Sequence, residues 1–543
     1  MELAQDVIQA LRFAVGDANV VTDEGARRAY ETATFVTTQR VLAVVAPAST
    51  AEVQKVVLLA NQFKISLYPV SRGRNWGLGS RVPVRDRSVI VDLRRMDRIV
   101  DFDRDLSYVT VEPGVTFRQL TDFLKDNAPS LYLSVIGGPP DASVLGNTLE
   151  RGDGLGPLGD RSEHCCALEA VLGNAELLHT GMAMFGDAPM SRLAPVGVGP
   201  EFSGLFFQSN LAIVTRVTVW LARVPSEFQG VAFALRDESL LPPVASAMRE
   251  LQQRGVVKPN SFALWNMHKL LASSGQYPFG DRGQPLASAE ELLARVPPSL
   301  RGVRWIGIGA LYSASILHAY ADKRAVRAAL GRYVSDLTIV NRASTLLAHM
   351  PTPLAPKILG MNAKQLYQLL YSDSPFLGNP TEFSIQSVYW RKRGEKPKQL
   401  DPDRDRCGLH WVCTAVPFDG EHIARHAKVV EQVARTYSLE PNLSYLNLSE
   451  RYLKSFAVIA FDREADDEEE RARACHDEML RRLMDAGYAP VRLGIQSMTS
   501  VSPSDPRYTE WLRRLKRLFD PNDVLAGGRY DFRHDWGEQN VLA

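Results

Sequence analysis

Three glycines lie within seven residues just after an apolar run, and they limit what this chain can fold into more than any other feature. The run Ile65–Pro69 predicts a strand, and the following loop, Pro69–Gly79, carries Gly73, Gly77 and Gly79. Glycine permits positive φ and close backbone approach, so successive N–H groups can converge on one anion. The loop therefore predicts a phosphate-binding site, and the expected ligand is a pyrophosphate. A tight surface turn is the alternative.

Three further segments accompany this loop along the chain. A strand and turn at Tyr108–Val115 lead to a second loop rich in glycine, serine and asparagine at Ser143–Gly152. The β pattern resumes at Gln208–Val217, and Asp520–Arg529 lies near the C-terminus. In this order the segments resemble those of the flavoproteins of the vanillyl-alcohol oxidase and para-cresol methylhydroxylase type, and the resemblance spans nearly the whole chain.

This resemblance implies a protein that binds FAD. It implies that the two loops hold the FAD pyrophosphate, that the strand Leu211–Val214 lies beside the adenine, and that Asp520–Arg529 is the family's C-terminal signature. Arg529 would lie near the isoalloxazine edge, and a salt bridge closing the C-terminus is its alternative role. The FAD-binding residues expected on this basis are Pro69, Ser71, Arg72, Gly73, Arg74, Asn75, Trp76, Gly77, Ser143, Val144, Gly146, Asn147, Glu150, Arg151, Gly152, Gly154, Ile213, Val214 and Arg529.

The composition is that of an ordinary soluble protein with two or three domains. The chain has 543 residues, of which 45% are hydrophobic and 23% charged, and its formal net charge is +1. Lysine and arginine are spread along the chain, which argues against a nucleic-acid partner. The start of the chain lacks a basic head with an apolar core, and no run reaches the roughly 18 apolar residues of a membrane span. These features predict a cytoplasmic protein without a membrane partner.

The cysteines do not indicate a disulfide framework or a metal site. There are five, at irregular spacing, which predicts mostly reduced thiols. The tripeptide His164-Cys165-Cys166 contains residue types that bind metal ions. Vicinal cysteines, however, chelate one ion poorly, and no second pair of ligands follows at the spacing of a zinc site. We therefore expect no metal and a structural role for this tripeptide.

The pattern of strands and helices predicts an α+β fold. A capped amphipathic helix is expected at residues 50–63, and short strands at Arg87–Leu93, Tyr108–Glu112 and Leu168–Leu172. From Gly230 to about Tyr488 the helical patterns lengthen. The resemblance implies a discontinuous FAD-binding domain with an α+β substrate (cap) domain inserted in it. The expected divisions are residues 1–224, 225–487 and 488–543, the last returning to the first domain.

Within the cap, Ile316–Tyr333 predicts a helix, while Phe383–Val388 and Ser455–Phe461 predict strands. The charged run Asp462–Arg471 is expected to open a helix and to present a solvated face, with a binding role as the alternative.

Arg492 is the candidate catalytic residue. In the resembling enzymes, an arginine beside a tyrosine binds a substrate phenolate together with a tyrosine of the phosphate loop. Arg492 stands at the arginine position, but Val491 and Leu78 replace the two tyrosines, and Leu155 replaces a third pocket tyrosine. A guanidinium binds a phenolate, and its planar fork matches a carboxylate better. The alternative role of Arg492 is a structural ion pair.

Two other family positions have also changed. Gly138 replaces an aspartate expected near the flavin N5; Asp141 lies three residues later, where loop packing is the alternative to a role in the site. The position of the family's flavin tether falls at Ser455, which is not an established tether, and Arg74-Asn75 replace the histidine of bicovalent relatives. Non-covalent FAD is therefore expected.

Asp153, Asp160 and His164 follow the second loop. His164 is a candidate base, with a solvated or core histidine as the alternative.

These observations predict an FAD-dependent oxidoreductase that removes a hydride from an aromatic, para-hydroxyphenyl-type small molecule. An alternative is a flavin-dependent oxidative decarboxylase or desaturase of an acyl tyrosine-like acid in secondary metabolism, because Arg492 or a cap arginine can hold a carboxylate. The third hypothesis is a protein that binds the flavin but does not catalyse a reaction. The electron acceptor, oxygen or another, stays open, and the resemblance implies a homodimer.

Overall fold

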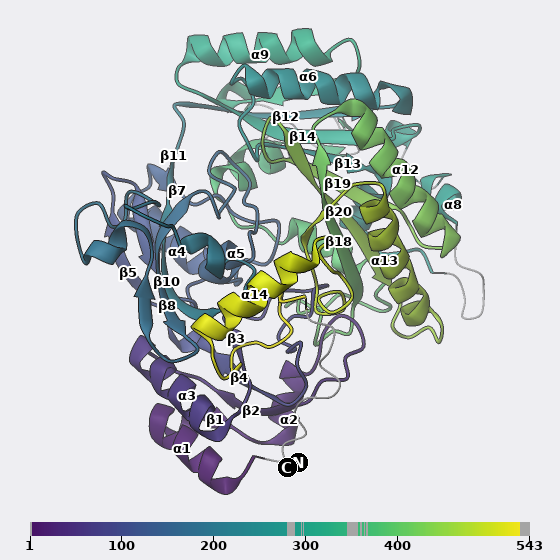
Figure 1. Ribbon diagram of the computed structural model, residues 1–543. Helices are drawn as coiled ribbons and strands as arrows, with labels where there is room; N and C mark the ends of the chain where they lie inside the picture. Colours follow the sequence, from purple (N-terminus) through teal and green to yellow (C-terminus); the bar gives the residue numbers. More distant parts are fainter. Residues whose placement is uncertain are drawn as a thin grey trace.

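The computed structural model describes residues 3–279, 288–294, 296, 298–344, 357–358, 361–362, 364 and 367–532. Three main sheets organise this part of the chain (Figure 1). The first has four strands in the order β1-β2-β4-β3, and only β1 is antiparallel to its neighbour. Its strands are β1 (Val20–Val21), β2 (Val41–Val45), β3 (Leu67–Val70) and β4 (Ser88–Asp92), accompanied by the helices α1 (Gln5–Val15), α2 (Glu24–Arg27) and α3 (Thr50–Phe63).

The helix α3 confirms the predicted capped helix at residues 50–63. The Ser49 hydroxyl accepts a hydrogen bond from the Glu52 N–H at 3.2 Å, and the Glu52 carboxylate accepts one from the Ala48 N–H at 2.8 Å. This reciprocal cap satisfies donors that the first helical turn leaves free. Val53, Val56 and the other apolar residues of its inner face are buried.

The second sheet has five antiparallel strands in the order β5-β6-β10-β8-β9. Its strands are β5 (Ile99–Asp103), β6 (Tyr108–Val111), β8 (Cys165–Leu172), β9 (Leu177–His179) and β10 (Ala212–Trp220). The helices α4 (Phe117–Asn127) and α5 (Val144–Leu149) and the small pair β7 (Leu131–Tyr132) and β11 (Ala222–Arg223) accompany it. The expected second glycine loop is thus largely helix α5, capped by the Ser143 hydroxyl, which accepts from the Gly146 N–H at 2.8 Å.

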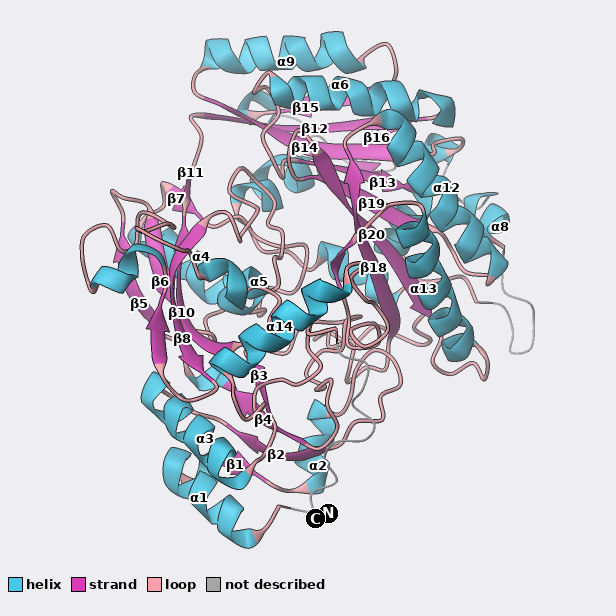
Figure 2. Ribbon diagram, viewed as in Figure 1, coloured by secondary structure: helices cyan, strands magenta, loops and turns pink. Residues whose placement is uncertain are grey.

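The third sheet has eight strands, each antiparallel to its neighbours, in the order β15-β12-β14-β13-β19-β20-β18-β21. They are β12 (Glu227–Leu235), β13 (Phe262–Asn266), β14 (Trp305–Ser313), β15 (Ser335–Val340), β18 (Gly408–Pro417), β19 (Asn442–Asn447), β20 (Tyr452–Phe461) and β21 (Pro490–Arg492). Four helices cover its outer face (Figure 2): α6 (Leu241–Gln253), α9 (Ile316–Leu330), α12 (Gly420–Thr436) and α13 (Glu468–Asp485). Elsewhere lie α7 (Met267–Ser274), α8 (Ala289–Ala294), β16 (Lys357–Ile358) and β17 (Met361–Asn362).

The prediction of a strand at Phe383–Val388 was wrong, because Phe383–Tyr389 forms a 3₁₀ helix. Ile385, Val388 and Tyr389 are buried in one apolar cluster with Trp76 and Leu409. The neighbouring strands β18 and β20 already pair with each other, which leaves this segment to pack on the sheet rather than join it.

The prediction of a solvated face for Asp462–Arg471 was wrong in part. The run does open helix α13, and Asp466 and Asp467 are exposed. Glu468, however, is completely buried and forms an ion pair with Arg391, which a count of charges along the sequence does not reveal.

The last part of the chain joins all three sheets. Strand β21 is the edge strand beside β18 in the eight-stranded sheet, and α14 (Pro506–Phe519) then runs back toward the smaller sheets (Figure 1). Leu525 pairs with Leu67 of β3, and the Lys516 ammonium donates to the Asn210 carbonyl at 2.7 Å. The divisions after residues 224 and 487 stay predictions. No helix in the described ranges is long and apolar enough to cross a lipid bilayer.

Candidate functional site

A cavity of about 470 Å³ lies between the glycine-rich loops and the inner face of the eight-stranded sheet. Most of the expected FAD-binding residues line it. They are Pro69, Ser71, Arg72, Gly73, Arg74, Asn75, Trp76, Ser143, Gly146, Asn147, Glu150, Arg151, Ile213, Val214 and Arg529, joined by the candidate catalytic Arg492. Gly77, Val144, Gly152 and Gly154 are not part of this lining.

The two glycine-containing segments form one continuous cradle. A Cβ added to Gly146 would lie 2.3 Å from the Ser71 hydroxyl, so helix α5 and the first loop meet with no space for a side chain. Gly73 and Gly77 have φ values of 63° and 77°. Within the described structure, the backbone N–H groups of Gly73 to Trp76 donate to no protein acceptor. An anion in the cavity would satisfy such donors.

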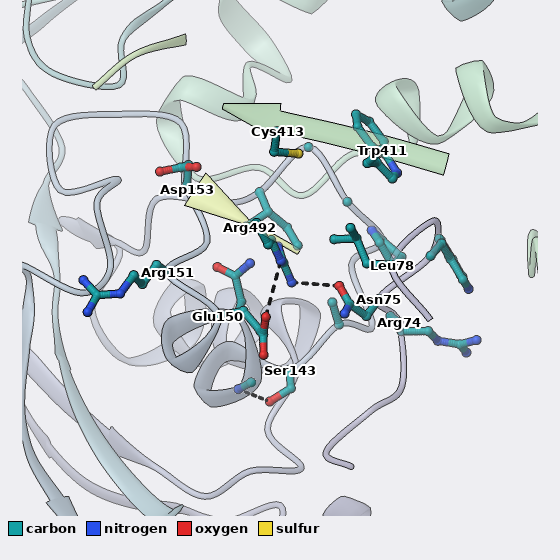
Figure 3. A pocket seen from close by; sticks show the side chains of 18 of the residues that line it. Arg74, Asn75, Leu78, Ser143, Glu150, Arg151, Asp153, Trp411, Cys413 and Arg492 are labelled. Atoms are coloured by element: carbon teal, nitrogen blue, oxygen red, sulfur yellow. Dashed lines mark hydrogen bonds and ion pairs between the residues drawn. The ribbon is translucent and has the colours of Figure 1, made fainter. Parts of the chain in front are cut away.

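Arg492 belongs to a charged cluster around Glu150 (Figure 3). Its Nη2 donates to the Asn75 amide oxygen at 2.7 Å, and its Nε lies 3.5 Å from a Glu150 oxygen. Arg529 also pairs with Glu150, and the Tyr530 hydroxyl donates to Glu150 at 3.1 Å. Burial alone would raise the pKa of Glu150, but Arg529, Arg492 and Tyr530 outweigh it and lower that pKa.

The cluster combines both roles considered for Arg492. The ion pair with Glu150 exists, yet the buried Nε of Arg492 makes no hydrogen bond within the described structure, because its geometry toward Glu150 is poor. Arg529 pairs with Glu150 as well, so Glu150 does not depend on Arg492 for its counterion. Arg492 therefore retains donors for an anionic ligand of the cavity.

The cavity wall is apolar at the positions of the expected tyrosines. Leu78, Leu155 and Val491 all line it, as does Gly138. Aromatic rings come instead from other elements, and the sequence did not single these out: Trp265 of β13, Phe376, Trp411 of β18 and Phe456 of β20. The pocket is thus lined with aromatic side chains but has lost the hydroxyl groups of the family pattern.

Asp141 contributes to loop packing. Its carboxylate accepts from Arg74 at 2.6 and 2.9 Å, and it is not part of the cavity lining. Arg74 also donates to Asp401 at 2.6 Å and so connects the phosphate loop to the eight-stranded part of the structure.

Ser455 faces away from the cavity, which corrects its assignment to the tether position. Its hydroxyl contacts Thr414 at 2.7 Å and the His426 ring at 3.2 Å, on the buried face behind the sheet. Because side chains alternate along a strand, its neighbours Lys454 and Phe456 line the cavity instead. The alternation of β20 could have revealed this from the sequence.

Asp153 lines the cavity, where its carboxylate accepts from the Lys454 ammonium at 2.7 Å. Burial raises the pKa of Asp153, against the opposing effect of Lys454. Asp160 and His164 lie outside the lining, and the His164 ring donates to the Asp160 carbonyl at 2.7 Å. His164 thus has the role of a satisfied structural histidine.

Lys269 also lines the cavity, and the sequence analysis missed it. A single lysine within an amphipathic helix carries no motif, so only the packing of α7 reveals its position. The five cysteine thiols are all buried and unpaired. Among the described residues, no three histidine, cysteine or acidic side chains are arranged to hold a metal ion.

Comparisons with known proteins agree with this geometry. A family model described as an FAD binding domain matches residues 41–181. The chain is 42% identical to 1'-carboxy-chondrochloren decarboxylase of Chondromyces crocatus, over 97% of each chain. It is 25% identical to the 4-cresol dehydrogenase [hydroxylating] flavoprotein subunit of Pseudomonas putida, over 96% of this chain and 94% of that one. The crystal structure of p-cresol methylhydroxylase with substrate bound superimposes with a TM-score of 0.83, at 25% identity and covering 98% of both chains.

The chain belongs to the vanillyl-alcohol oxidase and para-cresol methylhydroxylase family of FAD-binding flavoproteins. It is an FAD-dependent enzyme with the α+β fold of that family, as the sequence predicted. Its chemistry falls within flavin-dependent oxidation or oxidative decarboxylation.

FAD also fits the site on the geometry alone. The free N–H groups of Gly73 to Trp76 and the close approach at Gly146 suit a pyrophosphate, and Arg529 suits the edge of an anionic reduced flavin.

Proposed function

We propose that this enzyme is a flavin-dependent oxidative decarboxylase of an aromatic carboxylic acid. The observation that carries the proposal is the cavity wall itself. Leu78, Leu155 and Val491 replace hydroxyl groups that would bind a phenol, while the cationic Arg492 remains with unused donors. The identity of 42% with a decarboxylase supports the same chemistry. A substrate of the class Ar–CH₂–CH(NHCOR)–CO₂⁻, an acyl tyrosine-like acid, fits these features.

The reaction balances without a water nucleophile. The benzylic carbon loses a hydride, the adjacent carbon loses its carboxylate as CO₂, and an alkene, Ar–CH=CH–NHCOR, remains. When bound, FAD supplies the two-electron oxidising power by accepting that hydride. Arg492 would hold one polar end of the substrate with a charge-assisted hydrogen bond, and the aromatic wall would exclude water from the reacting carbons.

A second candidate is hydride removal from a para-alkylphenol without loss of CO₂. The retained Arg492 and the similarity to the 4-cresol dehydrogenase subunit favour it. Here Arg492 would hold the phenolate that the family's tyrosines otherwise help to bind.

Anaerobic mixing of the purified protein with N-acetyl-tyrosine, or with 4-ethylphenol, separates the two candidates. We expect the acid to bleach the flavin absorbance near roughly 450 nm. One equivalent of CO₂ and one of the enamide should appear for each flavin reduced. Bleaching by 4-ethylphenol alone, with no CO₂ from the acid, would replace the decarboxylase with the second candidate.

We also propose that FAD is bound non-covalently. Among the described residues of β20, Lys454 and Phe456 face the cavity, and neither is an established flavin tether. Denaturation in acid followed by ultrafiltration is expected to release all the yellow colour into the filtrate. Flavin that stays with the protein, located by peptide mass spectrometry, would contradict this proposal.

We also propose a cellular location, an oligomeric state and an electron acceptor. Five free, buried thiols suit a reducing compartment and support a cytoplasmic location. A homodimer, and oxygen or another acceptor for the reduced flavin, are proposed from the family resemblance.

A further inference from the structure

Lys269 occupies an unusual position in the cavity wall. It lies in the first turn of α7, its side chain lines the cavity, and only 4% of the residue is exposed. The ammonium donates to the Ser387 hydroxyl at 2.9 Å. It also lies 5.7 Å from the ring centroids of both Trp265 and Trp411, so two aromatic faces flank the charge.

Two other buried lysines show what Lys269 lacks. Lys454 and Lys516 are similarly buried, and each has a carboxylate 2.7 Å away, from Asp153 and Asp520 respectively. Within the described structure, no carboxylate pairs with Lys269. Burial without a counterion lowers the pKa of Lys269 to about 8. A hydroxyl and two aromatic rings offset only part of the cost of burying a charge.

The position of Lys269 separates it from Arg492 along the same wall. In the sheet, Arg492 of β21 is paired with Cys413 of β18, and Lys269 lies over Trp411, two residues before Cys413 in β18. Trp411 and Cys413 both line the cavity, as expected for alternate residues of one strand. Lys269 and Arg492 thus lie at different points of the cavity wall.

We propose that Lys269 binds the carboxylate of the substrate, while Arg492 binds the opposite, phenolic end. This assignment rests on the proposed decarboxylase function. The carboxylate provides the missing counterion in a site where Trp265 and Trp411 exclude water, and pairing is strong in such surroundings. The substrate class is then an acid with two polar ends, which is distinct from a simple alkylphenol.

The test compares N-acetyl-tyrosine with its neutral carboxamide, whose shape is nearly the same. The change in the flavin spectrum on binding measures the dissociation constant of each ligand, independently of turnover. The carboxamide is titrated under anaerobic conditions, and binding of the acid is followed by stopped flow at 4 °C. In the wild-type protein we expect the acid to bind at least about 10-fold more tightly than the amide. In Lys269→Met the acid should bind about 10- to 100-fold more weakly, with the amide unchanged.

The matched control is Lys428→Met, which removes an exposed lysine of α12 and changes the net charge equally. It should keep the full preference for the acid. If Lys269→Met does not fold, Lys269→Gln, which keeps a polar group beside Ser387, provides the same comparison.

The outcomes separate the two proposals. A wild-type protein that releases CO₂, with an acid preference that survives in Lys269→Met, would overturn the role of Lys269 alone. A wild-type protein that shows no acid preference and releases no CO₂ would overturn the decarboxylase function and this assignment together.

Discussion

Arg492→Met is expected to reduce turnover by about 100- to 1,000-fold while FAD remains bound. The guanidinium has a buried Nε without a hydrogen bond and faces the cavity, so its removal takes away the charge that would hold a substrate anion. Glu150 would keep Arg529 and Tyr530 as partners. The variant therefore leaves no unpaired buried carboxylate, and we expect the free energy of unfolding to fall by only about 1 kcal/mol.

Two further variants make this prediction specific. Arg492→Lys keeps the charge but loses the planar fork, so it should recover part of the lost activity. Arg28→Met removes an arginine from an exposed pair with Glu24 and should leave turnover unchanged. Steady-state turnover and the flavin absorbance of each purified variant provide the readout. Normal turnover in Arg492→Met would leave only the ion-pair role for this residue.

Local sequence was a good guide wherever the cause of a structure is local. Helix α3 has its cap and its apolar spacing within residues 48–63, and the glycines of the phosphate loop indicate its tight backbone directly. The position of Arg492 followed from the family motif, and the structure brings it to the cavity with both loops. In each case the residues that determine the conformation are neighbours in the chain.

The errors arose where the cause lies far away in the sequence. Phe383–Tyr389 folds as a 3₁₀ helix because its apolar face packs on Trp76, about three hundred residues earlier. Ser455 was assigned to the cavity without using the alternation of its strand. Lys269 carries no motif, and its environment comes from Trp265 and Trp411, which separate strands bring together.

Glu468 illustrates the same limit for charge. In the sequence it is one of several acidic residues in a charged run, but in the structure it belongs to a buried triad. Arg391 donates to Glu440 at 2.6 Å, pairs with Glu468, and lies 4.2 Å from the ring centroid of Tyr277. Arg391 lies two residues after the 3₁₀ helix Phe383–Tyr389, and Glu468 begins α13. Only the tertiary fold brings these charges together.

Arg391→Met is accordingly expected to destabilise the protein by about 3–5 kcal/mol, the largest stability effect that we predict. Arg391 is 1% exposed, and its loss would leave the buried Glu440 without its arginine and the buried Glu468 with only Arg471, 3.5 Å away. Urea unfolding followed by tryptophan fluorescence measures the change. Arg481→Met, which removes an exposed arginine paired with Glu478 and Asp485 on the same helix as Glu468, should shift the urea midpoint far less than Arg391→Met does.

The triple variant Arg391→Met, Glu440→Gln and Glu468→Gln separates charge from packing. If the buried carboxylates that have lost Arg391 cause the destabilisation, neutralising both should recover most of the stability that Arg391→Met loses. The effect should reach the active site, because the 3₁₀ helix just before Arg391 supplies Ile385 and Val388 to the cavity wall and Ser387 to Lys269. We therefore expect Arg391→Met, even at temperatures where it stays folded, to bind N-acetyl-tyrosine more weakly than the wild-type protein. Equal stability of Arg391→Met and the wild type would show that the triad does not hold this wall in place.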